Sequence, residues 1–235
     1  MDYSFLQCGE GALTVHLGDG IDPAINRRVT ALQGAIGSAG LRGITDLIPA
    51  YADLTVCYDC TVISAKALQR QLRRLLDSLF VAGQDRRRVF RLPVCYGGDY
   101  GPDLDFVCHH SGLSAQEVIE LHSAPDYLIY MLGFLPGFAY LGGLDPRLHT
   151  PRLDSPRTCI PAGSVGIGGA QTGVYPLASP GGWQLLGRTP VSVFDRQRQE
   201  PILYRAGDLV HFVPISPAEY EEIARAVAAG TYTVQ

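Results

Sequence analysis

The sequence predicts an α+β protein in which a small unit of strands and helices precedes a β-barrel. Residues 1–87 show apolar side chains that alternate or recur at helical spacing, whereas residues 88–235 show short apolar runs broken by many glycines and prolines. The chain has 235 residues, 46% of them hydrophobic and 18% charged, which is enough to bury a substantial core. We therefore expect two domains, residues 1–87 and residues 88–235.

The first domain has a regular succession of elements. Leu13, Val15 and Leu17 alternate as in a strand, and Asp22 with Pro23 is typical of a helix start. The expected elements are a strand near 13–17, a helix from 23 to 37 or 40, strands near 43–48 and 53–58, a helix after 64, and a strand in the segment RRRVFRLPV. The order βαββαβ is that of a ferredoxin-like sandwich.

The second domain begins with two expected short helices. The second of these starts with a capping box between Ser114 and Glu117. From residue 127 onward, short strands and turns predict a closed or nearly closed β-barrel. Ser216 and Glu219 then predict a C-terminal helix, and its apolar residues Tyr220, Ile223 and Val227 are expected to face inward. We place the domain boundary near residues 82–88.

Composition excludes several classes of function. The formal net charge of −4 gives no general attraction to nucleic acid or to an anionic membrane. No apolar run approaches the roughly 20 residues of a membrane span, and the first residues lack the pattern of a signal peptide. We expect a cytoplasmic protein that binds neither nucleic acid nor membrane.

The cysteines, histidines and the single lysine argue against three kinds of site. Cys57 and Cys60 form a CxxC, but they lie in a strand pattern in which positions three apart point to opposite faces. The histidines lack the spacing of metal ligands, so no metal site is expected. Lys66 follows no glycine-rich loop, which excludes a Walker A nucleotide site.

The segment AGSVGIGGAQTG, residues 162–173, is rich in glycine but lacks a dinucleotide fingerprint. Its backbone N–H groups can cradle a carboxylate or phosphate oxygen. Equally, its glycines can serve tight turns at barrel corners. Both interpretations remain open.

Polar residues around this segment are the candidate site. Arginine binds carboxylates and phosphates bidentately, glutamine both donates and accepts, and histidine serves as an acid or base. The candidate catalytic residue is His149, and the candidate substrate- or nucleotide-binding residues are Arg152, Arg157, Gly163, Ser164, Gly166, Gly168, Gln171, Thr172, Tyr175 and Gln184. We expect one barrel cleft to contain His149, Arg152, Arg157, Gln171 and Tyr175, with the backbone of residues 163–169 at its edge. The alternative is that these side chains bond to turn carbonyls and to one another.

Two longer segments carry a family resemblance. They are LHSAPDYLIYMLGFLPGFAYLGGLDPRLHTPRL and PAGSVGIGGAQTGVYPLASPGGWQLLGRTPVSVFD. They resemble the family of 5-oxoprolinase B subunits, also named KipI-like or allophanate hydrolase subunit 1. The resemblance is dense from about residue 92 to 213 and loose before residue 88. Ala139 and Cys159 depart from the family pattern, which has proline at the first position and a basic or aliphatic residue at the second.

The resemblance implies a small N-terminal α/β domain followed by a cyclophilin-like β-barrel. It also implies one component of an ATP-dependent 5-oxoprolinase, which opens the lactam of 5-oxo-L-proline to L-glutamate with the C and A subunits of that enzyme as partners. ATP would be a cosubstrate bound by this chain or shared with a partner. The alternative is a KipI-like module that inhibits a histidine kinase. With neither a phosphate-binding lysine nor a strong nucleophile, the chain alone is expected to be inactive.

Overall fold

The computed structural model describes residues 3–79 and 87–234 and divides the chain into two compact units, Met1–Arg86 and Arg87–Gln235. Each unit has a hydrophobic core of its own. The boundary expected near residues 82–88 lies largely outside the described residues, so the two domain ranges remain predictions.

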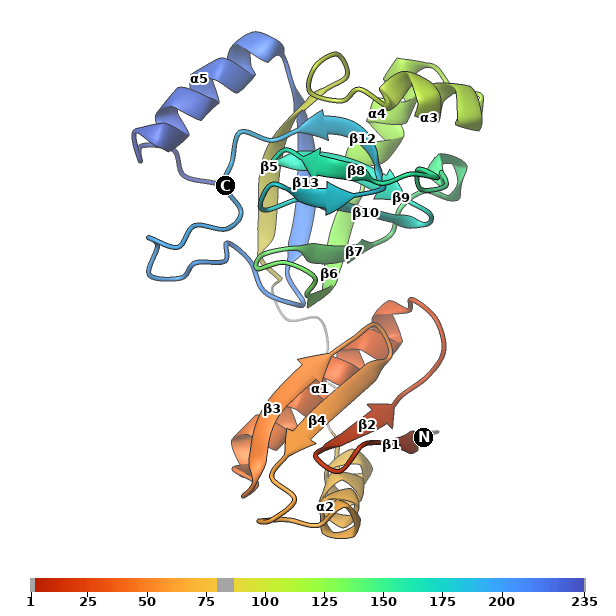
Figure 1. Ribbon diagram of the computed structural model, residues 1–235, viewed down its shortest axis with the longest axis vertical. Coiled ribbons are helices and arrows are strands. Elements are labelled where there is room, and N and C mark those ends of the chain that lie inside the picture. The colour runs from red at the N-terminus through yellow and green to blue at the C-terminus, as the bar shows by residue number, and fades with distance from the viewer. Residues whose placement is uncertain (1–2, 80–86, 235) are drawn as a thin grey trace. The chain divides into compact units, whose positions relative to one another are not determined.

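The first unit is an antiparallel sheet with two helices (Figure 1). Its elements are β1 (Ser4–Cys8), β2 (Ala12–His16), α1 (Pro23–Ala39), β3 (Ile44–Pro49), β4 (Asp53–Tyr58) and α2 (Ala65–Asp77). The strand order is β1-β2-β4-β3, and every neighbouring pair is antiparallel. The core combines inward residues of β2 and β4 with the apolar faces of both helices.

This arrangement corrects the predicted order βαββαβ. The segment RRRVFRLPV does not complete the sheet, because its strand, β5 (Val89–Tyr96), pairs with strands of the second unit. The sheet position beside β2 is taken instead by β1, whose residues are mostly exposed and give no apolar alternation to detect. The split arrangement of β2, α1 and β3 with β4 between them is present, but the ferredoxin-like assignment as a whole is not confirmed.

The helices of the first unit begin and end where the sequence indicated. The Asp22 carboxylate accepts the Ala24 N–H at 2.6 Å, and Gly40 ends α1 in the left-handed conformation with φ 56°. Helix α2 is capped by Ser64, whose side chain accepts the Ala67 N–H. The buried side chains of the two helices, spaced three and four residues apart, are Val29, Leu32 and Ile36 in α1 and Leu68, Leu72 and Leu76 in α2.

The second unit is a closed β-barrel, as predicted (Figure 1). Its elements are β5, α3 (Leu104–Ser111), α4 (Ala115–Ser123), β6 (Asp126–Leu132), β7 (Ala139–Gly142), the 3-10 turn η1 (Pro146–Leu148), β8 (Arg157–Ile160), β9 (Ser164–Gly168), β10 (Gln171–Val174), β11 (Ser179–Gly181), β12 (Gln184–Arg188), β13 (Leu209–Ile215) and α5 (Pro217–Ala228). The barrel order is β10-β7-β6-β13-β5-β12-β9, closed by β9 against β10, and β8 and β11 form a separate ribbon. A cyclophilin-like barrel fits this topology.

Strand β5 joins two distant parts of this unit. It runs parallel to β13 from the pair Val89 and Leu209 to the pair Cys95 and Ile215, and it also pairs with β12. The first strand of the barrel therefore lies beside the last one. The barrel is filled by apolar side chains from every barrel strand and from α3 and α4.

The helices of the second unit follow the predicted caps. Reciprocal capping boxes join Ser114 to Glu117 at α4 and Ser216 to Glu219 at α5. Figure 1 shows α5 on one side of the barrel and α3 and α4 on the other. The expected inward residues of α5 are only half-buried, because this helix covers the barrel surface loosely. No helix within the described residues is long and apolar enough to cross a membrane.

Candidate functional site

The glycine-rich segment forms β9 and β10 of the barrel wall. A side-chain carbon on Gly168 would overlap the Trp183 indole, and one on Gly166 would meet the Gln184 carbonyl. Strand β9 lies between β10 and β12, so its backbone groups are committed to two ladders. This placement favours a third role for these two glycines, close packing, over either a turn or an anion cradle.

Gly163 has the turn role that the sequence allowed. Its φ is 80°, its N–H donates to the Tyr175 carbonyl at 2.7 Å, and a side-chain carbon would collide with the Thr189 carbonyl. Only glycine adopts this conformation at such a close approach without strain.

The single tryptophan, Trp183, is the centre of an aromatic cluster outside the barrel core. Its ring centroid lies 5.6 Å from that of Phe138 and 6.1 Å from that of Tyr175, and both pairs are close to edge-to-face. Ile160 and Leu185 complete the buried part of the cluster. Aromatic pairs at these spacings are favourable beyond the area that they bury.

Both predicted arginines converge on this Trp183 cluster. The Arg152 guanidinium carbon lies 5.9 Å from the centre of the Trp183 ring, and Arg157 Nη1 donates to the Trp183 carbonyl at 3.3 Å. Burial raises the pKa of Tyr175, and a backbone hydrogen bond from Trp183 and the charges of the two arginines partly oppose that rise. The structure thus brings Arg152, Arg157 and Tyr175 together, as the sequence predicted.

Asp103, which the sequence analysis missed, holds one of these arginines. Its Oδ1 lies 2.6 Å from Arg157 Nη2, and its Oδ2 accepts the Leu185 N–H at 2.7 Å. The Asp103 side chain is 12% exposed and the Arg157 side chain 30%. Arg157 is therefore engaged in the structure, whereas Arg152 is exposed and better placed to meet an anion. The only sequence signal at Asp103 was its position before a helix.

Two predicted binding residues are buried with an unpaired oxygen. Gln184 is 2% exposed, and its amide nitrogen donates to the Pro151 carbonyl at 3.1 Å. Its Oε1, like the hydroxyl of fully buried Ser164, has no hydrogen-bond partner within the described residues. The Gln184–Pro151 bond ties strand β12 to the residue that precedes Arg152.

Thr172 belongs to a buried hydrogen-bond chain. Its hydroxyl donates to the Gly166 carbonyl at 3.0 Å and lies 2.7 Å from His122 Nε2, so the histidine nitrogen is the donor in that second bond. His122 Nδ1 then accepts from the Tyr96 hydroxyl at 2.8 Å. Burial lowers the pKa of His122 to about 3, so the ring is neutral at pH 7. Thr172 is a component of the barrel interior.

His149 and Gln171 lie outside this constellation. His149 is exposed after η1, and its described interactions are with the Pro146 carbonyl and electrostatically with Asp145. Hydrogen bonds from Arg147, with a smaller contribution from the His149 charge, lower the pKa of Asp145 to about 2. Gln171 is half-buried at the start of β10, opposite Gly168.

Similarity to known proteins decides the family. The carboxyltransferase domain family, subdomains C and D, matches residues 3–204. A Bacillus subtilis protein named as the B subunit of 5-oxoprolinase is 42% identical over 228 residues, which are 93% of this chain and 95% of that protein. The chain belongs to the family of 5-oxoprolinase B subunits. An Escherichia coli O157:H7 protein of the same name is 45% identical over 207 residues, covering 88% of this chain and 93% of its own length.

Solved structures support the fold of this family member. A conserved uncharacterized protein from Pyrococcus horikoshii is 43% identical, with a TM-score of 0.56 over 92% of this chain and 100% of that chain. The urea carboxylase of Kluyveromyces lactis is 23% identical, with a TM-score of 0.80 over 99% of this chain and 23% of that chain. At that identity the second likeness shows the fold alone.

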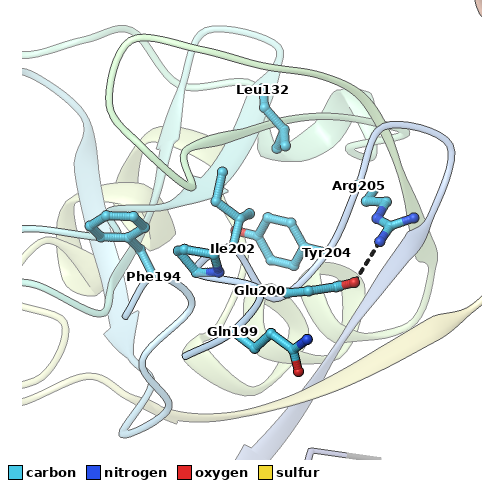
Figure 2. A pocket seen from close by; sticks show the side chains of 8 residues that line it. Leu132, Phe194, Gln199, Glu200, Ile202, Tyr204 and Arg205 are labelled. Atoms are coloured by element: carbon cyan, nitrogen blue, oxygen red, sulfur yellow. Dashed lines mark hydrogen bonds and ion pairs between the residues drawn. The ribbon is translucent and has the colours of Figure 1, made fainter. Parts of the chain in front are cut away.

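The barrel of this B-subunit family member also holds pockets away from the Trp183 cluster. Figure 2 shows one of about 550 Å³, which has an exposed Glu200–Arg205 ion pair of 2.8 Å at its edge. Its lining residues are Leu132, Phe194, Gln199, Glu200, Pro201, Ile202, Tyr204 and Arg205. A smaller pocket of about 190 Å³ lies where the turn at Gly163 meets α5. Gly163 is the one predicted site residue that lines either of these two pockets.

The expected single cleft is therefore present only in part. Arg152, Arg157 and Tyr175 gather around Trp183, but no described contact brings His149 or Gln171 to them. Within residues 3–79 and 87–234, no group of three His, Cys, Asp or Glu side chains is arranged to hold a metal ion.

Proposed function

We propose that this chain is one component of an ATP-dependent 5-oxoprolinase that opens the lactam of 5-oxo-L-proline to L-glutamate together with the C and A subunits of that enzyme. The observation that carries this proposal is the similarity to proteins named as B subunits of 5-oxoprolinase over nearly their full length. A relative that is named as a B subunit belongs to a protein with further subunits. The need for ATP assigns the work to the cytoplasm.

The chemistry explains why ATP is needed. A lactam carbonyl is stabilised by resonance with its nitrogen, so water attacks it slowly. Transfer of a phosphoryl group to the lactam oxygen would weaken that resonance and create a good leaving group. Water can then attack the activated carbon, and the ring opens when the carbon–nitrogen bond breaks.

The contribution of this chain is substrate positioning at the Trp183 cluster. Arg152 is exposed and offers a guanidinium to the substrate carboxylate, with the Trp183 ring beneath it. Arg157 stiffens the same region through Asp103. His149, the candidate acid or base, would reach the lactam in the assembled complex.

The described residues do not fit a nucleotide site of this chain alone. The glycines of β9 pack against Trp183 and Gln184 and do not form a phosphate loop, and Lys66 is exposed on α2 in the other unit. We therefore assign the phosphates of ATP to a partner chain or to a site shared with it, and derive no step from ATP bound to this chain.

Reconstitution tests the proposal. The chain is purified alone and together with its candidate C and A partners, and ATP-dependent release of glutamate from 5-oxo-L-proline is measured. Turnover is expected only when all three chains and ATP are present. Turnover by the pure single chain would contradict the division of labour, and inactivity of the complete mixture would contradict the proposed function.

A further inference from the structure

The first unit contains a pocket for which the proposed function has no use. It has a volume of about 670 Å³, within the range of about 300–1,000 Å³ that is usual for small-molecule sites. It lies between the segment that follows α1 and the segment that leads into α2. Its lining residues are Gly40, Leu41, Arg42, Thr61, Val62, Ile63, Ala67 and Gln71.

The walls of this pocket are fixed to each other. The Asp59 N–H donates to the Gly43 carbonyl at 2.8 Å, which joins the two segments next to the pocket. Gly43 has a φ of 87°, and a side-chain carbon there would press on Val62 and Ile63 at 3.0–3.2 Å. The two segments are therefore in close contact, and the pocket is preformed.

Two polar groups of the lining lack protein partners. The Arg42 guanidinium is exposed and makes no ion pair or hydrogen bond with the described residues. Gln71 Oε1 is buried, and it has no hydrogen-bond partner in the same part of the chain. The acid of the neighbouring turn, Asp59, is already engaged, because its carboxylate accepts both the N–H and the hydroxyl of Thr61.

These groups define a ligand by their chemistry. A guanidinium without a partner suits a carboxylate, and a buried carbonyl oxygen without a partner suits an N–H donor. Leu41, Val62 and Ala67 supply an apolar wall beside them. Ala67 and Gln71 are four residues apart and therefore share one face of α2.

We propose that this pocket binds an N-acylated α-amino acid. Such a molecule carries a carboxylate for Arg42 and, one carbon away, an amide N–H for Gln71 Oε1. The class includes a cyclic member, 5-oxo-L-proline, and open-chain members such as an acylated leucine or the last residue of a peptide. Because the pocket lies in the first unit, this site is separate from the Trp183 cluster.

Calorimetric titration of the full chain tests the proposal. The probes are 5-oxo-L-proline and N-acetyl-L-leucine, and their comparison distinguishes a cyclic from an open-chain ligand. Two reference compounds each lack one group: N-acetyl-L-leucinamide has no carboxylate, and 4-methylpentanoate has no amide. We expect at least one acid to bind, and both reference compounds to bind at least tenfold more weakly. Absence of binding by both acids, or equal binding of the reference compounds, would overturn the proposal.

Matched variants locate the site. Arg42→Gln and Gln71→Leu should each weaken binding at least tenfold, whereas Arg70→Gln, at an exposed arginine of α2 outside the lining, should leave it unchanged. Arg152→Gln should also leave it unchanged. Loss of binding in Arg152→Gln with none in Arg42→Gln would place the acid in the second unit and refute this inference. Thermal melting of each variant verifies that the first unit is folded.

Discussion

Arg157 and Asp103 form an ion pair of 2.6 Å across 54 residues of sequence. The second carboxylate oxygen of Asp103 accepts the Leu185 N–H at 2.7 Å. One side chain at the start of α3 therefore fixes both β8 and β12. Because β12 continues from Trp183, this carboxylate also supports the cluster on which Arg152 lies.

Replacement of Asp103 by alanine should destabilise the second unit. The change leaves a partly buried guanidinium and a backbone N–H without their acceptor, which costs about 1–3 kcal/mol. Urea unfolding measures the loss. The control is Glu200→Gln, which removes the exposed ion pair with Arg205 and should cost about 0–1 kcal/mol. Equal effects of the two variants would contradict a structural role for Asp103.

Gly168→Ala should disturb Trp183. The added carbon overlaps the indole, and overpacking of this kind costs about 1–3 kcal/mol. Because Trp183 is the only tryptophan, its fluorescence reports the displacement directly. In Gly34→Ala the new carbon meets open space on α1, so the emission should stay unchanged and stability should rise by up to about 1 kcal/mol. An unshifted spectrum in Gly168→Ala would refute the packing role.

Acid should weaken the barrel through His122. Its pKa is about 3 in the folded chain against 6.5 without burial, so the unfolded chain binds more protons between these values. The contribution of neutral His122 is complete above pH 6.5 and is lost as the pH falls toward 3, by at most about 1.4 kcal/mol per pH unit. His122→Gln should flatten the decline of unfolding free energy over that window. Parallel curves for the two proteins would contradict the assignment.

His149→Ala should lower the turnover of the assembled complex at least about tenfold, the low end for loss of an acid or base. Arg152→Gln should act mainly by raising KM, since it removes a contact with the substrate carboxylate. The control is His109→Ala, at an exposed histidine of α3. Turnover that is unchanged in His149→Ala would leave that residue without a part in the chemistry.

Limited trypsin digestion should cut first within residues 83–88, where turn-forming residues and arginines meet in the sequence. Two fragments should accumulate, and each should melt cooperatively, because each unit has its own core. Early cutting within residues 142–190 would instead show that the glycine-rich part of the barrel is poorly ordered.

The elements that local sequence determines were predictable. The helix starts at Asp22, Ser114 and Ser216 depend on side chains within three residues of the cap, and the structure confirms them. The barrel was predictable because short apolar runs between turns leave few other ways to bury both ends of each strand. Strand β5 was recognised as a strand but assigned to the wrong sheet, because a pattern of alternation does not name its partner.

The candidate site was harder to predict because its contacts join distant segments. Gly168 is explained by Trp183, and Arg157 by Asp103, and neither partner lies in the same motif. Thr172 and Gln184 were polar residues in a pocket-like segment, yet the closed barrel places both in its buried wall. A polar side chain near a glycine run marks a site only when the fold leaves it accessible.

The parallel pairing of β5 with β13 constrains how the chain folds as it is made. The barrel cannot close until β13 has left the ribosome, although β5 appears more than 100 residues earlier. At about 5–20 residues per second, that delay is on the order of ten seconds. During this time the apolar face of β5 has no permanent neighbour, whereas every strand that the first unit needs has already been made. Nascent chains paused before residue 209 should therefore carry a folded first unit and an open second unit that recruits chaperones.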